Sequence, residues 1–159
     1  MGALHAGHAE LIRRARSLAD EVVVSVFVNP LQFENSEDLA KYPRTPREDE
    51  AIARAAGATQ VWFPMYDEIY PEGFTTLSAG ALGSLYEGAS RPGHFDGVVT
   101  VVRRLFDLVK PDVALFGEKD FQQLALVRTI AREVTIVAVP TVREDDGLAL
   151  SSRNEIGRA

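Results

Sequence analysis

The sequence has no cysteine among its 159 residues. This absence excludes disulfides, thiolate zinc sites, iron–sulfur clusters and cysteine nucleophiles. It suits a reducing compartment, so we expect a cytoplasmic protein.

The sequence also lacks an excess of basic residues and a long apolar run. Its formal net charge is −6, whereas binding to a nucleic-acid backbone needs a broad basic surface. The longest apolar run, around Val22–Val28, is far shorter than the roughly 20 residues that span a bilayer. The Gly/His-rich start does not resemble a signal peptide. We therefore expect no nucleic acid or membrane as partner, and basic residues that act locally on an anionic ligand.

What is present is typical of one soluble domain over residues 1–159. Hydrophobic residues make up 46% and charged residues 25%, which argues against disorder. Helical spacing of apolar residues and β-branched runs alternate along the chain. Helices are predicted at 11–18, 46–57, 81–86, 96–109 and 121–131, and strands at 22–28, 60–63, 75–78, 113–116 and 135–139.

Alternating strands and helices predict a doubly wound α/β fold with a parallel sheet and helices on both faces. Thr45, Pro46 and Glu48 predict a capping box at one helix start, and Gly57 predicts its stop. Ligands of such sheets bind beyond the carboxyl ends of the strands. Because Met1 opens directly into a loop, we expect the sheet to lack its first strand here.

The segment His5-Ala6-Gly7-His8 lies where this loop becomes a helix. A helix N-terminus attracts phosphate through its N–H groups and dipole, and each imidazole can donate a hydrogen bond. A bare HxxH more often marks a metal pair or two surface histidines. The glycine, the apolar helix behind it and the motifs further along favour a phosphate site.

Two later motifs carry positive charge. Gly117-Glu118-Lys119-Asp120 follows a predicted buried strand; Lys119 suits phosphates and Asp120 suits ribose hydroxyls. Leu150-Ser151-Ser152-Arg153 adds two hydroxyls and a guanidinium, which binds phosphate through two hydrogen bonds. Each motif alone is more often a charged turn or a solvated loop.

Neutral amides at strand ends suggest a small polar acid as second ligand, although such amides also cap turns. They are Asn29, Gln32, Gln122 and Gln123. His94 either lines the same site or caps the following helix, and the structural role is slightly favoured. Asp145-Asp146-Gly147 predicts a turn rather than a magnesium site.

Together the motifs resemble the pantoate–β-alanine ligase family of the HIGH-type nucleotidylyltransferase superfamily, whose HIGH motif is HAGH here. The matching stretches are, in order, MGALHAGH, FVNPLQF, DLAKYPRT, EGASRPGHFDGVVTVV, FGEKDFQQL and PTVREDDGLALSSRN. The resemblance implies a Rossmann-like nucleotide-binding domain that condenses pantoate with β-alanine through a pantoyl adenylate. ATP with Mg²⁺, pantoate and β-alanine are the implied ligands, and a homodimer is the implied assembly.

The resemblance assigns roles to matching positions. His8 would donate a proton and bind phosphate beside His5, with Lys119 and Arg153 also on the phosphates. Gln32 and Gln123 would hold pantoate, and Gln32 would also meet β-alanine. The implied ATP-binding residues are Met1, Gly2, Ala3, Leu4, His5, Ala6, Gly7, His8, Gly117, Glu118, Lys119, Asp120, Val142, Leu150, Ser151, Ser152 and Arg153.

Family members begin earlier, with a strand, and continue into a C-terminal domain, so we expect a domain that is truncated at both ends. Two other functions remain open. One is another HIGH-type nucleotidylyltransferase, which would need a more basic acceptor pocket. The other is an inactive fragment that binds ATP weakly or merely dimerises.

Overall fold

Four short strands form two parallel pairs in the computed structural model, which describes residues 2–152 and residue 154. In the first pair, β1 (Val23–Ser25) lies beside β2 (Gln60–Trp62), with Val24 opposite Val61. In the second, β3 (Val113–Gly117) lies beside β4 (Thr135–Val139), with Leu115 opposite Val137. The parallel α/β class predicted from the sequence is confirmed. Within the described residues, however, the two pairs are not joined into one sheet.

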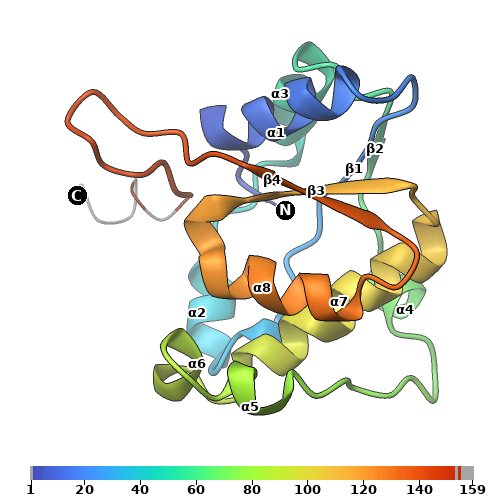
Figure 1. The fold of residues 1–159 in the computed structure, drawn as a ribbon, viewed down its shortest axis with the longest axis vertical. Helices are drawn as coiled ribbons and strands as arrows, with labels where there is room; N and C mark the ends of the chain where they lie inside the picture. The colour runs from blue at the N-terminus through green and yellow to red at the C-terminus, as the bar shows by residue number, and fades with distance from the viewer. Residues whose placement is uncertain (1, 153, 155–159) are drawn as a thin grey trace.

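Helices cover both faces of the strands (Figure 1). On one face lie α1 (Ala6–Arg16) and α3 (Pro46–Ala55), and on the other lie α7 (His94–Val109) and α8 (Phe121–Ile130). The apolar spacing that predicted these helices also directs their buried faces inward. This three-layer arrangement confirms the prediction of helices on both faces.

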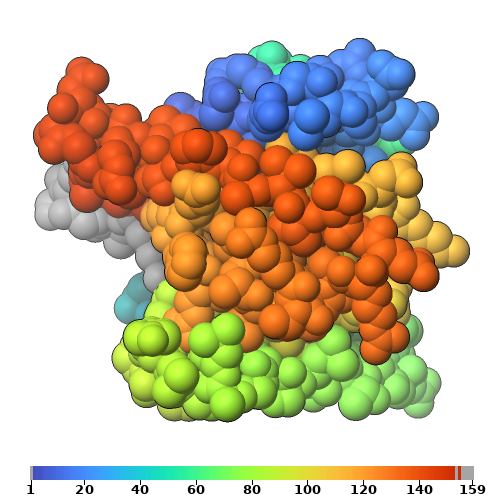
Figure 2. Space-filling model, viewed as in Figure 1, coloured from blue at the N-terminus to red at the C-terminus, as the bar shows by residue number. Residues whose placement is uncertain are grey.

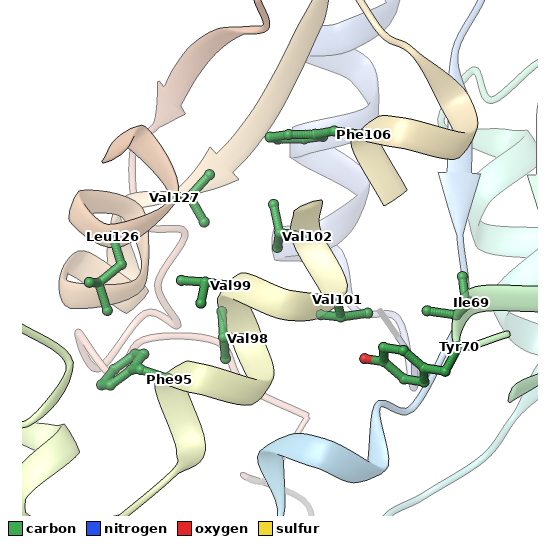
Figure 3. Packing of buried hydrophobic residues seen from close by; sticks show 10 residues of the cluster. All are labelled: Ile69, Tyr70, Phe95, Val98, Val99, Val101, Val102, Phe106, Leu126 and Val127. Atoms are coloured by element: carbon green, nitrogen blue, oxygen red, sulfur yellow. The ribbon is translucent and has the colours of Figure 1, made fainter. Parts of the chain in front are cut away.

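The larger of two apolar clusters lies around α7. Successive apolar side chains of α7 point in different directions (Figure 3). Val99 lies towards Val127 on α8, whereas Val101 lies towards Tyr70. The second cluster joins α1, α3, β1 and the loop before α1, and it buries Leu4 and Ile12. The loop that carries the histidines is therefore anchored in the core by Leu4.

Short elements fill the connections, and several were not predicted. Thr75–Ser78 was predicted as a strand, and this prediction is wrong: the segment pairs with no strand among the described residues, and the Leu77 amide instead donates to Thr100 Oγ1 on α7 at 2.9 Å. The helix expected over 81–86 lies slightly earlier, as α5. The short elements are the 3₁₀ helices η1 (Pro30–Gln32) and η2 (Glu118–Asp120) and the helices α2 (Ser36–Lys41), α4 (Tyr66–Ile69), α5 (Gly80–Gly83) and α6 (Glu87–Ser90).

The ends of α3 show one correct and one wrong prediction. Gly57 follows the helix at φ +110°, a backbone conformation that favours glycine, and so marks its end. The predicted capping box is absent, because the Thr45 side chain accepts no capping hydrogen bond. Its hydroxyl donates instead to Asp49 Oδ1 at 3.2 Å.

After β4 the chain forms an arm that projects from the body (Figure 2). Arg143 and Ala149 form an antiparallel bridge, and Gly147 turns the chain at φ +88°. The turn predicted at Asp145-Asp146-Gly147 is confirmed. The arm then returns to the first loop, where Ser152 Oγ donates to the carbonyl of Ala3 at 3.0 Å.

No helix in residues 2–152 combines the length and apolar character needed to cross a membrane.

Candidate active site

The side chains of the two histidines together cap the N-terminus of α1. His5 is the N-cap, and its Nδ1 accepts a hydrogen bond from the Gly7 amide at 3.1 Å. His8 Nδ1 accepts from the His5 amide at 3.3 Å, and the two ring centroids lie 4.1 Å apart. Because each Nδ1 acts as acceptor, the ring proton of each neutral imidazole is on Nε2. The loop therefore sets the tautomer of both rings.

His8 is uncharged at neutral pH. Burial, followed by the neighbouring His5, lowers the pKa of His8 from 6.5 to about 3. An uncharged imidazole with its proton on Nε2 is a hydrogen-bond donor at that atom. In the ligand-free chain it is not an imidazolium and so does not act as a general acid.

The loop before His5 is held in place by a residue that was not predicted from the sequence. Asp49, on α3, accepts hydrogen bonds from the amides of Ala3 and Leu4. A single carboxylate in an acidic sequence gives no pattern by which to find it. Ser152, from the arm, holds the same loop from the other side.

The FVNPLQF segment turns Asn29 inward and supports Gln32. Asn29 is only 3% exposed. Its Oδ1 accepts from Tyr70 Oη at 2.7 Å and from the Leu31 amide at 3.3 Å. Its Nδ2 donates to the Gly97 carbonyl at 3.0 Å and to Gln32 Oε1 at 3.3 Å. Asn29 thus supports the side chain of Gln32, and it also lines the cavity described below.

Tyr70 remains a hydrogen-bond donor to this group. Burial, and then the neighbouring Tyr66, raises the pKa of the Tyr70 hydroxyl above its ordinary value. The hydroxyl therefore keeps its proton and donates to Asn29.

Of the two roles considered for His94, lining the cavity described below is observed, whereas the capping role is not, because Gly93 is the N-cap of α7. His94 is the first residue of that helix. Arg91 can only donate, so His94 Nε2 accepts from Arg91 Nη1 at 3.1 Å and Nδ1–H donates to the Gln32 carbonyl at 2.8 Å. His94 thereby joins α7 to the Gln32 backbone.

The two neighbouring glutamines of the FQQL motif differ. Gln122 fastens the α5–α6 region, since its Nε2 donates to the carbonyls of Leu82 and Leu85 at 2.8 and 2.7 Å. Gln123 lines the cavity instead. Only Gln123 is therefore placed to meet a ligand there.

Lys119 follows β3 in η2 and is exposed next to Asp120, with Nζ 3.1 Å from Asp120 Oδ1. In parallel α/β folds the carboxyl ends of the strands meet at one edge. The lysine is accordingly at the same end of the strands as the Asn29–Gln32 segment.

A cavity of about 810 Å³ connects these segments. It brings together most of the predicted site residues, and also Phe33, Tyr42, Glu87 and Arg91, which the sequence did not single out. Gly2, Ala3, Leu4, Ala6 and Glu118 do not line it, and Met1 and Arg153 lie outside the described residues. The predicted residues that line it are His5, Gly7, His8, Asn29, Gln32, His94, Gly117, Lys119, Asp120, Gln123, Val142, Leu150, Ser151 and Ser152.

The polar end of the cavity suits an anion beside a small polar molecule. Two imidazoles and a lysine supply donors and positive charge, while Gln32 and Gln123 supply neutral amides. Among the described residues, no group of three or more histidine or acidic side chains could hold a metal ion.

The fold and site define a class: an α/β nucleotide-binding domain with a histidine-bearing loop at the start of its first helix. The model of the pantoate–beta-alanine ligase family matches residues 1–156. The chain therefore belongs to the pantoate–beta-alanine ligase family.

Relatives and solved structures agree. The chain is 62% identical to a pantothenate synthetase of Streptomyces avermitilis, over 97% of this chain and 49% of that protein. It resembles the crystal structure of pantothenate synthetase from Thermus thermophilus with a TM-score of 0.91 and 54% identity, over 98% of this chain and 58% of that one. A Francisella tularensis pantoate–beta-alanine ligase, solved with beta-gamma ATP and beta-alanine, gives a TM-score of 0.94 and 40% identity over 98% and 62%. The chain thus spans about half the length of the curated relatives it matches.

Proposed function

We propose that this chain forms the ATP- and pantoate-binding part of an AMP-forming pantoate–β-alanine ligase. The observation that carries the proposal is the cavity in which two histidines, Lys119 and two glutamines meet. The histidines and the lysine match a nucleotide phosphate, and the amides match a hydroxy acid. Family membership supports this pairing of ligands.

In the proposed first step, a pantoate carboxylate oxygen attacks the α-phosphorus of ATP, and the bond to the bridging oxygen breaks. Pyrophosphate leaves with the electron pair, and pantoyl adenylate remains. Such transfers depend on positioning and on stabilisation of negative charge. His5 and His8 donate through Nε2–H, and Lys119 and Arg153 supply positive charge.

The pKa of His8 refines its role. With that pKa at about 3, His8 enters the reaction neutral and donates a hydrogen bond rather than an imidazolium proton. Bound phosphates would raise the pKa of His8, because an adjacent negative charge favours the protonated form. His8 therefore becomes a better proton donor only when ATP is in place.

In the second step the β-alanine amine attacks the activated carbonyl, and AMP leaves. Gln32 and Gln123 hold pantoate, and Gln32 also meets β-alanine. Gln32 suits this double role because Asn29 Nδ2 contacts its side-chain oxygen and His94 Nδ1 its backbone carbonyl. The amide is thus held in place before substrate arrives.

Three accompanying features are proposed with the function. Mg²⁺ accompanies ATP and neutralises part of the phosphate charge, and no protein ligand is assigned to it. The chain forms a homodimer. Candidate interface residues are the exposed apolar side chains of the middle segment, Met65, Tyr66, Leu77, Leu85 and Tyr86. The location is the cytoplasm.

Pantoate-dependent exchange of labelled pyrophosphate into ATP, without β-alanine, tests the proposal. We expect exchange by the protein that contains this chain, and a loss of at least about 100-fold in His8→Ala, as for removal of a donor to transition-state charge. Arg14→Ala, on the exposed side of the same helix, is the control and should keep wild-type exchange. Full exchange by His8→Ala would exclude the role given to His8.

The other candidate functions give different results. A nucleotidylyltransferase with another acceptor would transfer AMP stably to that acceptor, whereas the ligase releases AMP only when β-alanine is added. An inactive fragment would bind ATP in calorimetry without any exchange. β-Alanine in the structure of the Francisella relative favours the ligase.

A further inference from the structure

A buried carboxylate binds the backbone of the loop that leads into His5 and His8. Asp49 is 1% exposed, in the first half of α3. No Lys, Arg or His side chain in the described part of the chain forms an ion pair with it. A buried carboxylate without a cation is costly unless hydrogen bonds replace its hydration. The groups that supply those hydrogen bonds therefore indicate what Asp49 does.

Among the described residues, three groups donate to the side chain of Asp49, and two of them are amides of the loop. Oδ1 accepts from the Leu4 amide at 2.6 Å, and Oδ2 accepts from the Ala3 amide at 3.2 Å. The third donor, Thr45 Oγ1, lies 3.2 Å from Oδ1. Ala3 has φ +49°, a left-handed conformation that alanine rarely adopts. The carboxylate thus holds the loop in a backbone conformation that the sequence alone disfavours.

The hydrogen bond from Leu4 to Asp49 lies only one peptide unit away from the amide of His5. Leu4 immediately precedes His5, whose amide donates to His8 Nδ1. The direction of the His5 amide depends on where the Leu4 backbone is held. That amide also determines which nitrogen of His8 carries the proton. Asp49 is therefore linked to the His8 tautomer by continuous hydrogen bonds and backbone.

We propose that Asp49 is a positioning residue of the active site: its carboxylate fixes the Ala3–Leu4 backbone so that His5 and His8 present Nε2–H to the ATP phosphates. The role at ATP rests on the proposed function above. Asp49 itself does not line the cavity, so it acts only through the loop.

Asp49→Asn tests this proposal with little change in volume. The Asn amide nitrogen would face an N–H group of the loop, so one loop hydrogen bond is lost. Two control variants separate positioning from stability. Glu48→Gln makes the same chemical change at the exposed neighbouring residue, and Thr45→Val removes a hydrogen bond to the same carboxylate but leaves both loop amides bound.

The first readout is ¹⁵N NMR of the histidine rings in this chain, which needs no activity. In the wild type, Glu48→Gln and Thr45→Val, we expect His8 to be the Nε2–H tautomer alone. In Asp49→Asn we expect a mixture of tautomers and a His8 pKa that moves back towards 6.5. An unchanged tautomer and pKa in folded Asp49→Asn would overturn the proposal and leave Asp49 a structural residue.

The second readout is pantoate-dependent exchange. Asp49→Asn should lower kcat about tenfold or more with little change in the KM for pantoate, and both controls should stay within about twofold of wild type. Loss of stability without this loss of kcat also argues against positioning. If the wild-type protein shows no exchange, the proposed function fails, whereas the NMR result still decides the role of Asp49.

The unmodified chain offers a test that does not depend on the folding of a variant. A short hydrogen bond to a buried carboxylate should move the Leu4 amide proton downfield and slow its exchange with solvent. A Leu4 amide that exchanges like an exposed loop amide would contradict the proposal.

Discussion

The backbone of Gly97 in α7 lies directly against the carbonyl group of Leu31 in η1. A Cβ built on Gly97 would overlap the Leu31 carbonyl carbon and oxygen. This close approach lets Asn29 Nδ2 reach the Gly97 carbonyl at 3.0 Å. The position of Gln32 at the cavity therefore depends on the absence of a side chain at residue 97.

Gly97→Ala should destabilise the chain although it lies within a helix. Alanine gains about 1 kcal/mol over glycine in helix propensity, but the overlap with backbone atoms of η1 forces the two elements apart. We expect a net loss of about 2 kcal/mol or more in the free energy of unfolding, measured in urea. Gly117→Ala is the control, because nothing lies within 4 Å of its Cβ position. Equal stability of the two variants would refute the packing argument.

Tyr70→Phe should loosen Asn29 without disturbing the apolar core. The variant removes the 2.7 Å hydrogen bond to Asn29 Oδ1 and leaves the bond from the Leu31 amide. A loss of about 1 kcal/mol in the free energy of unfolding is expected, together with a higher KM for pantoate. Tyr66→Phe, whose side chain is half exposed, should change neither. An unchanged KM in Tyr70→Phe would separate Asn29 from the function of Gln32.

Periodic segments were predicted well from the sequence because burial of one face or both faces dictates their pattern. The four main helices and the core of each parallel pair follow from this. The capping box at Thr45 failed because the hydroxyl donates to the carboxylate of Asp49, four residues further along, and the side chain accepts no capping hydrogen bond. The strand expected at Thr75–Ser78 failed because its amide at Leu77 binds the side chain of Thr100 rather than a strand. Thr100 lies 23 residues from Leu77, so the sequence around Leu77 does not contain its partner.

The candidate site shows the same division. Residue chemistry and the position of motifs at strand ends predicted which segments meet in the cavity. Side-chain direction was beyond this reasoning: Gln122 turns away to bind backbone carbonyls, and Asn29, which lines the cavity, also binds the Gly97 carbonyl. Asp49 was missed because its function depends on amides 45 and 46 residues away. Long-range contacts of single side chains leave no periodic signal.

The lowered pKa of His8 gives a pH dependence of stability with a definite sign. The unfolded chain takes up a proton at His8 near pH 6.5, whereas the folded chain does so only near pH 3. Protons therefore favour the unfolded state between these values, and the free energy of unfolding falls as pH falls, by at most about 1.4 kcal/mol per pH unit. Above pH 6.5 the effect vanishes.

His8→Asn isolates this contribution. Asparagine can accept the His5 amide hydrogen bond as His8 Nδ1 does, yet it does not titrate. Urea unfolding at pH 7.5 and pH 5.0 should show wild type losing about 1–2 kcal/mol more than His8→Asn between the two values. Parallel losses in both proteins would mean that His8 is not shielded from protonation.

The two strand pairs predict an alternating pattern of amide exchange. The Val26 amide donates to Trp62 and the Thr135 amide to Asp112, so even-numbered residues of β1 and β3 face their paired strand. Val23, Val113 and Leu115 then direct their amides to the other side, where residues of β1 and β3 line the same cavity. Hydrogen exchange followed by NMR should therefore be fast at Val113 and Leu115 and slow at Ala114 and Phe116. Uniform protection along β3 would mean that a further strand or another chain occupies that side in solution, so the pattern measures directly whether the two pairs remain apart.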